Sequence, residues 1–373
     1  MRMKDAVLRL RRELTTASPA FRHALRAGLA TSAAFIAARM LGLSHEMWVI
    51  VSVVVIMRPS LGGTLRFGRD RVLGTIAGAL VAIAVVLLTK ASGVWFVLLL
   101  VVSFFTTLFL HVVHYLGFVT FLSFTVVLGL GIVFPEGWKL GVERIWDTLL
   151  GGGIGLGAAF FIWPNRAAKG IDSRVASSLN DLGALFRILG KSYQAGEVRP
   201  EEIVAARRKT YDSLNGCREI FSEAAAEAGL SRAGRNDLSR LSAVLDKLYD
   251  LLMSMDTVVR RVSGEGPPES LGNDLHQLLE TVDLEFAWMT DYARGRKEET
   301  TRPNGAAALA EMFDRIRIVR ARGDLEGHSM EHRTNLSAFL YHVYAVVQEL
   351  ENGFELLKSY RAGRTEEDSS FQA

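Results

Sequence analysis

The sequence predicts an all-α protein, with a domain of six transmembrane helices followed by a cytoplasmic helical bundle. The main observation is an abrupt change in composition. Residues 1–165 hold long apolar runs and 15 Lys and Arg against 7 Asp and Glu, a net charge of +8. Residues 166–373 are amphipathic and hold 28 Lys and Arg against 33 Asp and Glu, a net charge of −5. One apolar half and one half of ordinary polarity indicate a membrane domain joined to a soluble one.

Long apolar tracts define the spans, because a helix needs about 20 residues to cross the hydrocarbon core. The tract at residues 94–134 is too long for one crossing, and His111, His114 and Tyr115 predict a turn within it. Six crossings follow: 24–43, 45–57, 72–88, two within 94–134, and 146–163. The predicted domains are an N-terminal cytoplasmic segment (1–20), the transmembrane domain (21–165), the cytoplasmic bundle (166–361) and a flexible tail (362–373).

Basic residues predict the orientation of these spans, because cytoplasmic loops are enriched in Lys and Arg. With the N-terminus in the cytoplasm, thirteen basic residues of the first half and its junction lie inside and four lie outside. Both termini are therefore expected to face the cytoplasm. The basic N-terminal tract lies beside a membrane helix and indicates a retained signal anchor, so we expect no nucleic-acid partner.

The third and sixth predicted spans share a pattern of Arg, Thr and Gly. Each matching pair is 73 residues apart: Arg71 and Arg144, Thr75 and Thr148, Gly78 and Gly151. Two three-helix halves joined head to tail must have opposite orientations, as in inverted-repeat transporters. The alternative is a chance match, since Arg and Thr often mark a helix start.

Several motifs carry a family resemblance: His45-Glu-Met-Trp-Val-Ile, Met57-Arg-Pro-Ser-Leu-Gly-Gly-Thr-Leu-Arg, Arg71-Val-Leu-Gly-Thr-Ile-Ala-Gly-Ala-Leu, Glu143-Arg-Ile-Trp-Asp-Thr-Leu-Leu-Gly and Phe161-Ile-Trp-Pro-Asn-Arg. Over residues 20–170 the chain resembles the fusaric acid resistance and aromatic acid exporter family. The resemblance implies efflux of small organic anions, including aromatic carboxylic acids, across a bacterial inner membrane. Plant malate channels of similar membrane architecture leave an anion channel as an alternative.

The resemblance also implies partners. Long members of the family carry two membrane units, each with a soluble domain, whereas this chain has one of each. A homodimer is therefore expected, in contact with membrane lipid, and a periplasmic adaptor protein is a further partner expected of such an exporter. A non-transporting envelope scaffold is the alternative from a different functional class.

Arg71 and Arg144 are the predicted anion-binding residues, because a guanidinium group binds a carboxylate through two hydrogen bonds. Each stands near a predicted helix start, where the backbone dipole favours an anion. Thr75 and Thr148 lie one turn further along and are assigned to the same substrate site. The alternative is that both arginines are interfacial anchors, pairing with Asp70 and Asp147.

Other residues are candidates for coupling or stacking. Asp147 is either a salt-bridge partner of Arg144 or a carboxylate that takes up a proton during transport. His111 and His114 would relay protons, or are simply turn residues. Trp48 and Trp146 would stack on an aromatic substrate, although interfacial tryptophans are common without a ligand.

Glycines of the third and sixth spans are predicted to allow close helix packing in lipid. They are Gly74, Gly78, Gly151 and Gly155. Gly62 and Gly63 predict a flexible break after Pro59.

The second half predicts bundled helices separated by breakers near Gly196, Gly229, Gly264–Pro268, Pro303 and Gly327. Apolar residues alternate at steps of three and four along two of them, which is typical of bundle seams. These residues are Leu238, Leu241, Leu245, Leu248, Leu252, Met255 and Val259, and Leu336, Leu340, Val343, Val347, Leu350, Phe354 and Leu357. No nucleophile–base pair or metal-ligand cluster is evident. We expect no enzyme activity, metal or cofactor.

Overall fold

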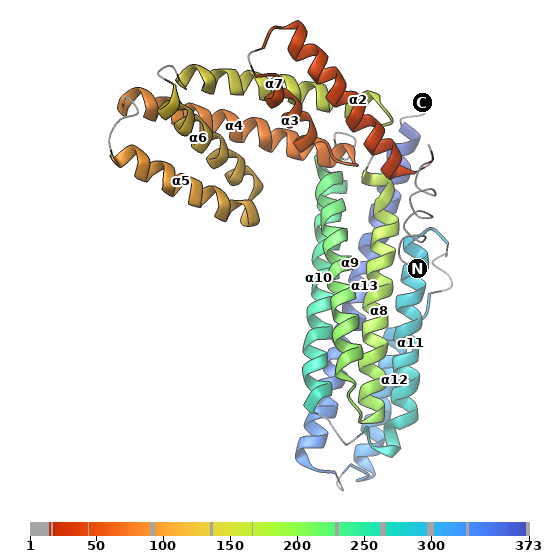
Figure 1. The fold of residues 1–373 in the computed structure, drawn as a ribbon. Helices are drawn as coiled ribbons and strands as arrows, with labels where there is room; N and C mark the ends of the chain where they lie inside the picture. Colours follow the sequence, from red (N-terminus) through yellow and green to blue (C-terminus); the bar gives the residue numbers. More distant parts are fainter. Residues whose placement is uncertain are drawn as a thin grey trace, which may run out of the picture. The chain divides into compact units, whose positions relative to one another are not determined.

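The computed structural model describes residue 15 and residues 18–43, 45–89, 94–134, 137–165, 167–227, 231–261, 266–296, 302–325 and 328–370. These residues form α-helices and one 3-10 helix, with no strand among them. The chain divides into two compact units, one ending at Ala167 and the other beginning at Ala168 (Figure 1). Of the sequence predictions, the N-terminal segment 1–20 and the breakers Gly229, Gly264 and Gly327 lie largely outside the described residues.

The first unit contains six helices in the predicted order: α2 (Pro19–Met40), α3 (Glu46–Ile56), α4 (Leu61–Thr89), α5 (Val94–Val113), α6 (Tyr115–Val133) and α7 (Gly137–Phe161). The tract from 94 to 134 is divided at His114, where the turn is predicted. Helices α4 and α7 begin earlier than their predicted spans, because their first turns carry charged residues that an apolar pattern does not include.

Among the described residues, three helices are long and apolar enough to cross a membrane: Leu61–Leu88, Val94–Val113 and Tyr115–Val133. Helix α3 is apolar but short. Helices α2 and α7 have the length, but the charged residues within them lower their hydropathy. The prediction of six crossings is therefore supported by helix order and only in part by helix composition.

The two halves of this unit exchange partners. Helix α4, the third helix of the first half, packs against α6, the second helix of the other half. Helix α7, the third helix of the second half, packs in the same way against α3. Helices α4 and α7 also pack against each other. This reciprocal arrangement is what two halves related by an inverted repeat would show.

Glycines make these contacts close. A methyl group at Gly78 would overlap the carbonyl oxygen of Thr120 on α6. At the matching position Gly151, it would lie 2.6 Å from the carbonyl oxygen of Val49 on α3. A methyl group added at Gly74 or at Gly155 would also be too close, 2.9 Å from a side-chain carbon of the facing helix. The four glycines therefore let helix backbones approach directly.

The turn between α3 and α4 is ordered by hydrogen bonds, so the predicted flexible break at Gly62–Gly63 is wrong. The Ser60 hydroxyl accepts a hydrogen bond from the Gly63 N–H at 2.9 Å, as an N-cap does. The Thr64 hydroxyl accepts from the Arg58 N–H at 3.0 Å. Both glycines are buried in the first turn of α4.

The second unit is an all-helical bundle (Figure 1). Its elements are the 3-10 helix η1 (Ala167–Gly170), α8 (Ile171–Ala195), α9 (Pro200–Ala226), α10 (Arg232–Arg261), α11 (Glu269–Ala293), α12 (Gly305–Ala321) and α13 (Met330–Ser370). All residues of the two predicted seams are buried, and α10 packs against α13, which carries the second seam. Helix α13 continues as far as Ser370, so the tail expected to be flexible from residue 362 is helical over its described backbone.

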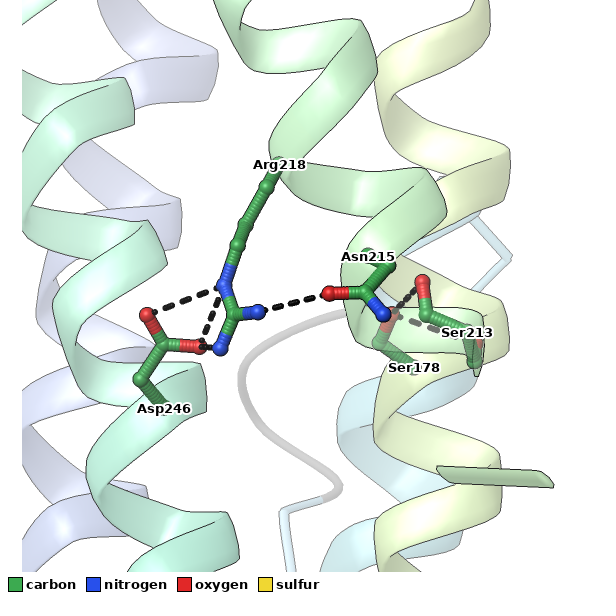
Figure 2. Close-up of polar contacts among 5 residues, drawn as sticks. All are labelled: Ser178, Ser213, Asn215, Arg218 and Asp246. Carbon is green, nitrogen blue, oxygen red and sulfur yellow. Dashed lines mark hydrogen bonds and ion pairs between the residues drawn. The ribbon is translucent and has the colours of Figure 1, made fainter. Parts of the chain in front are cut away.

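Polar contacts tie the bundle helices together at several points. Figure 2 shows Arg218 of α9 reaching Asp246 of α10 at 2.6 Å and Asn215 at 2.7 Å. On the other side of α9, the Ser178 hydroxyl of α8 donates to the Ser213 carbonyl oxygen at 3.3 Å. These ionic groups are partly exposed, so we expect them to add little stability.

A more buried network joins three segments of the bundle. Arg302, in the segment before α12, contacts Glu285 of α11 and Glu351 of α13 at 2.5 and 2.7 Å. Its side chain is 13% exposed and that of Glu285 is 2% exposed. Here a buried arginine has two carboxylate partners.

Candidate anion-binding site

Arg71 and Arg144 occupy matching places on α4 and α7, and both are buried, with exposed fractions of 3% and 4%. The two helices pack against each other. The guanidinium groups are close enough for the positive charge of Arg71 to act on Arg144. The structure therefore brings together the two arginines that the sequence singled out.

Neither arginine forms an ion pair within 4.0 Å among the described residues. Nε of Arg71, and Nε and Nη1 of Arg144, are buried without a hydrogen-bond partner. Asp70, the expected partner of Arg71, instead binds Arg69 at 2.9 Å. Asp147 makes no direct ion pair with Arg144. The structure thus does not show the anchoring pairs that were the alternative interpretation.

Arg144 lies in an aromatic and acidic setting. Its guanidinium carbon is 4.1 Å from the ring centroid of Trp48, a cation–π contact. Asp147 is 2% exposed and is influenced electrostatically by Arg144 and by Glu143. At the start of α3, His45 Nδ1 lies 3.3 Å from Glu143 Oε2. Titratable groups therefore surround this arginine without neutralising it through a direct contact.

Arg71 lies beside Tyr115, the first residue of α6. The hydroxyl of Tyr115 is buried without a hydrogen-bond partner, and Arg71 and Arg58 both act on it electrostatically. The Tyr115 and Phe67 rings meet edge to face, with their centroids 4.7 Å apart. The guanidinium carbon of Arg58 lies 3.9 Å from the centroid of the Phe67 ring. Tyr115 was predicted only as a turn residue. The sequence around Tyr115 gives no signal of this role, because the role depends on arginines of other segments.

The two threonines are buried with the arginines. Thr75 is fully buried and receives a 3.4 Å hydrogen bond from the Ser123 hydroxyl of α6. Thr148 is 3% exposed. Trp146, in contrast, is 65% exposed, whereas the next residue, Asp147, is 2% exposed. The structure places Trp48 next to an arginine and leaves Trp146 outside the cluster.

The histidines lie at the turn between α5 and α6. His114 is the N-cap of α6, and its Nδ1 accepts a hydrogen bond from the Gly117 N–H at 3.1 Å. His111 packs edge to face on Phe118 at 4.9 Å, and Phe118 also neighbours Tyr115. The turn role is therefore visible for His114, and both histidines belong to the same end of the helices as Tyr115.

Arg26 is a buried arginine that sequence reasoning missed. It is 2% exposed, and Nη2 donates to the carbonyl oxygens of Arg58 at 2.6 Å and Pro59 at 3.0 Å. Nη1 lies 3.5 Å from the Trp163 carbonyl oxygen, and Trp163 has a left-handed φ of +46° that turns the chain after α7. Arg26 continues a buried stripe formed by Ala30, Ala34 and Ala38, and this spacing of four was the available signal.

No group of three or more His, Cys, Asp or Glu in the part of the chain that the structure describes is arranged to hold a metal ion. The site instead consists of cationic and hydroxyl donors with aromatic side chains. They are carried by α4 and α6, which are long and apolar enough to span a membrane, and by α3 and α7, which pack in the same unit. These features define a helical membrane protein with a candidate site for anions.

The comparison with protein families gives the class a name. Residues 32–158 match the family described as fusaric acid resistance protein-like. This match confirms the resemblance inferred from the motifs: over these residues the chain is similar to that family. The matched segment runs from α2 almost to the end of α7, so it includes both site arginines.

Several curated proteins are similar to this chain. The inner membrane protein YccS of Escherichia coli is 23% identical over 325 residues, covering 86% of this chain and 43% of YccS. Protein ORF2 of Neisseria gonorrhoeae is 22% identical over 221 residues, covering 58% of this chain and 52% of ORF2. A Haemophilus influenzae protein is 24% identical over 265 residues, 70% of this chain and 35% of that protein. The chain thus spans about half or less of the length of these relatives.

Proposed function

We propose that this protein moves small organic anions across a bacterial inner membrane, with Arg71 and Arg144 binding the anion in turn. The carrying observation is the pair of buried guanidinium groups that have no carboxylate within ion-pair distance. An uncompensated buried charge is costly, and the cost is accepted where function requires it. A carboxylate ligand would satisfy the open N–H groups through paired hydrogen bonds.

The membrane arrangement supports this function. We propose that α2 to α7 all cross the membrane, with both termini in the cytoplasm, as the excess of basic residues indicates. The name of YccS supports the inner membrane as the location. In this orientation α4 and α7 run in opposite directions, and each arginine lies in the first half of its helix. The pair therefore approaches the membrane centre from its two sides.

Efflux would need an energy source, and Asp147 is the best-placed group to couple it to protons. Its buried carboxylate lies near Arg144 without a direct ion pair, so taking up a proton would change the charge that the anion meets. His114 is a weaker candidate because its Nδ1 caps α6. A homodimer and a periplasmic adaptor remain part of this proposal, as the family resemblance implies. Aromatic carboxylic acids are the proposed substrates, and Trp48 beside Arg144 would suit them.

The test is anion flux in proteoliposomes under an imposed pH gradient, with aromatic and aliphatic carboxylates compared. Arg144→Gln should lower the flux about 100-fold, since it removes the charged contact. Arg39→Gln is a matched control, because Arg39 is 68% exposed and pairs with Glu46. Its flux should equal that of the unmodified protein.

Three outcomes separate the alternatives. Flux that follows the pH gradient and requires Arg144 supports a proton-coupled exporter. Flux that requires Arg144 but ignores the gradient supports an anion channel. A folded protein that carries no anion over a broad panel would contradict transport and support an envelope scaffold.

A further inference from the structure

A second basic site lies at the start of α2. A pocket of about 200 Å³ is formed where the start of α2, the α3–α4 turn and the end of α7 meet. Its lining consists of Arg22, His23, Arg26, Pro59, Trp163, Pro164 and Asn165. Three of these side chains are basic and none is acidic.

The pocket is built around a buried charge. Arg26 is only 2% exposed, and its Nε is buried without a hydrogen-bond partner. The Nδ1 atom of His23 is also buried without a partner. The positive charges of Arg26 and Arg58 both act on His23. The carbonyl oxygens that hold Arg26 orient the guanidinium group but carry no formal charge, so the site keeps a net positive charge that an anion would neutralise.

The surface beside the pocket is apolar. Trp163 is 48% exposed, and the neighbouring Phe160 and Phe161 are 48% and 89% exposed. On α2, Leu25 and Leu29 are 37% and 49% exposed. A polar anion-binding pocket bordered by exposed aromatic and aliphatic side chains matches the two parts of a phospholipid, a charged headgroup and its acyl chains.

We propose that this pocket binds the phosphate group of an anionic phospholipid from the cytoplasmic leaflet. Arg22, His23 and Asn165 would face the phosphate, and Arg26 would supply buried positive charge behind them. The acyl chains would lie on Phe160 and Phe161. The proposal rests on the membrane orientation given above and is independent of transport, because none of the pocket residues belongs to the Arg71–Arg144 cluster.

Binding can be measured on the delipidated full-length chain in detergent by native mass spectrometry. The probes are dioleoyl-phosphatidylglycerol, which is anionic, dioleoyl-phosphatidylcholine, which has no net charge, and inorganic phosphate as a competitor. Arg22→Gln removes a pocket arginine with an exposed side chain. Arg66→Gln is the matched control, because Arg66 is also exposed and lies on α4 outside the pocket. Circular dichroism before lipid addition checks that both variants are folded.

We expect one phosphatidylglycerol to bind each chain more tightly than phosphatidylcholine and to be displaced by inorganic phosphate. Arg22→Gln should weaken that binding about fivefold, the effect expected for one basic residue near an anionic lipid, and Arg66→Gln should leave it unchanged. Equal binding of the two lipids, or equal losses in the two variants, would overturn the proposal. Binding of inorganic phosphate that depends on Arg22, without binding of phosphatidylglycerol, would assign the site to a soluble phosphate and overturn the lipid source.

Discussion

The two units of this protein bury arginines in opposite ways. In the bundle, Arg302 is 13% exposed and is neutralised by Glu285 and Glu351. In the membrane unit, Arg71 and Arg144 are more deeply buried and have no carboxylate partner within ion-pair distance among the residues that the structure describes. The bundle adds charge pairs to its apolar seams, whereas close glycine contacts join helices of the membrane unit. A buried arginine therefore makes a structural contact in one unit, and in the other we propose that it binds an anion.

The largest effect should come from Arg302→Gln. This change leaves Glu285 as an uncompensated buried carboxylate, and breaking such a pair costs about 3 kcal/mol or more. The midpoint of thermal unfolding of the bundle should fall by roughly 6–12 °C. A fall of less than about 2 °C would show that the bundle does not depend on its charge pair and would remove the contrast with the membrane unit.

The same variant should be pH dependent. Burial raises the pKa of Glu285 above its ordinary value of 4.5, although Arg302 opposes the shift. A carboxyl group with a raised folded-state pKa stabilises the fold below its unfolded pKa and loses that contribution as pH rises through the folded value. Without Arg302 the pKa should rise further. Arg302→Gln should therefore destabilise the protein more at pH 8 than at pH 5, and equal effects at both pH values would contradict this account.

Gly78→Ala tests whether glycine contacts hold the membrane unit. The added methyl group would overlap the Thr120 carbonyl oxygen, so α4 must move away from α6, at a cost of about 1–3 kcal/mol. Gly153→Ala is the control, because nothing lies within 4 Å of the added carbon. Thermal unfolding in detergent should show a lower midpoint for Gly78→Ala alone. If both alanine variants unfold at the same temperature, close helix contact is not what stabilises this unit.

Arg144→Gln should act on stability in the opposite direction from Arg302→Gln. It removes a buried charge that has no direct partner. The free energy of unfolding in detergent should therefore stay the same or rise by about 1 kcal/mol, and the thermal midpoint should not fall. Transport should be lost in the same variant. A large fall in the midpoint would mean that Arg144 is a structural residue and would weaken the anion-site proposal.

The smallest effect is expected for Arg218→Ala in the bundle. Its ion pair with Asp246 is short, but the two side chains are 42% and 36% exposed. Exposed pairs contribute about 0.2–1 kcal/mol, so the midpoint should shift by no more than about 4 °C. A loss as large as that of Arg302→Gln would show that burial is not what separates strong from weak pairs here.

Much of the architecture could be predicted from the sequence because it depends on periodicity. The seams of α10 and α13 repeat at steps of three and four, and every seam residue is buried. The order of α2 to α7 follows from the apolar tracts and their breaks. The starts of α4 and α7 could not be found in this way, since helices extend into charged turns and Ser60 caps α4 through a local hydrogen bond.

The site was only partly predictable. The repeat pattern identified Arg71 and Arg144, because matched positions in two halves occupy matched places in the fold. Tyr115 and Arg26 were missed because their roles depend on helix neighbours distant in sequence: Arg71 for one, and the carbonyl oxygens of Arg58, Pro59 and Trp163 for the other. Trp146 was included on residue type alone, and only the three-dimensional structure shows that it faces outward.

The exchange of partners between the two halves has a consequence for biosynthesis. Helix α7 is the last of the membrane unit to be synthesised, yet it contacts α2, α3, α4 and α6. Before α7 is synthesised, α3 lacks its close contact with Gly151, and α4, which carries Arg71, lacks the packing that α7 provides. The packing of this unit can therefore be completed only after α7 has been synthesised.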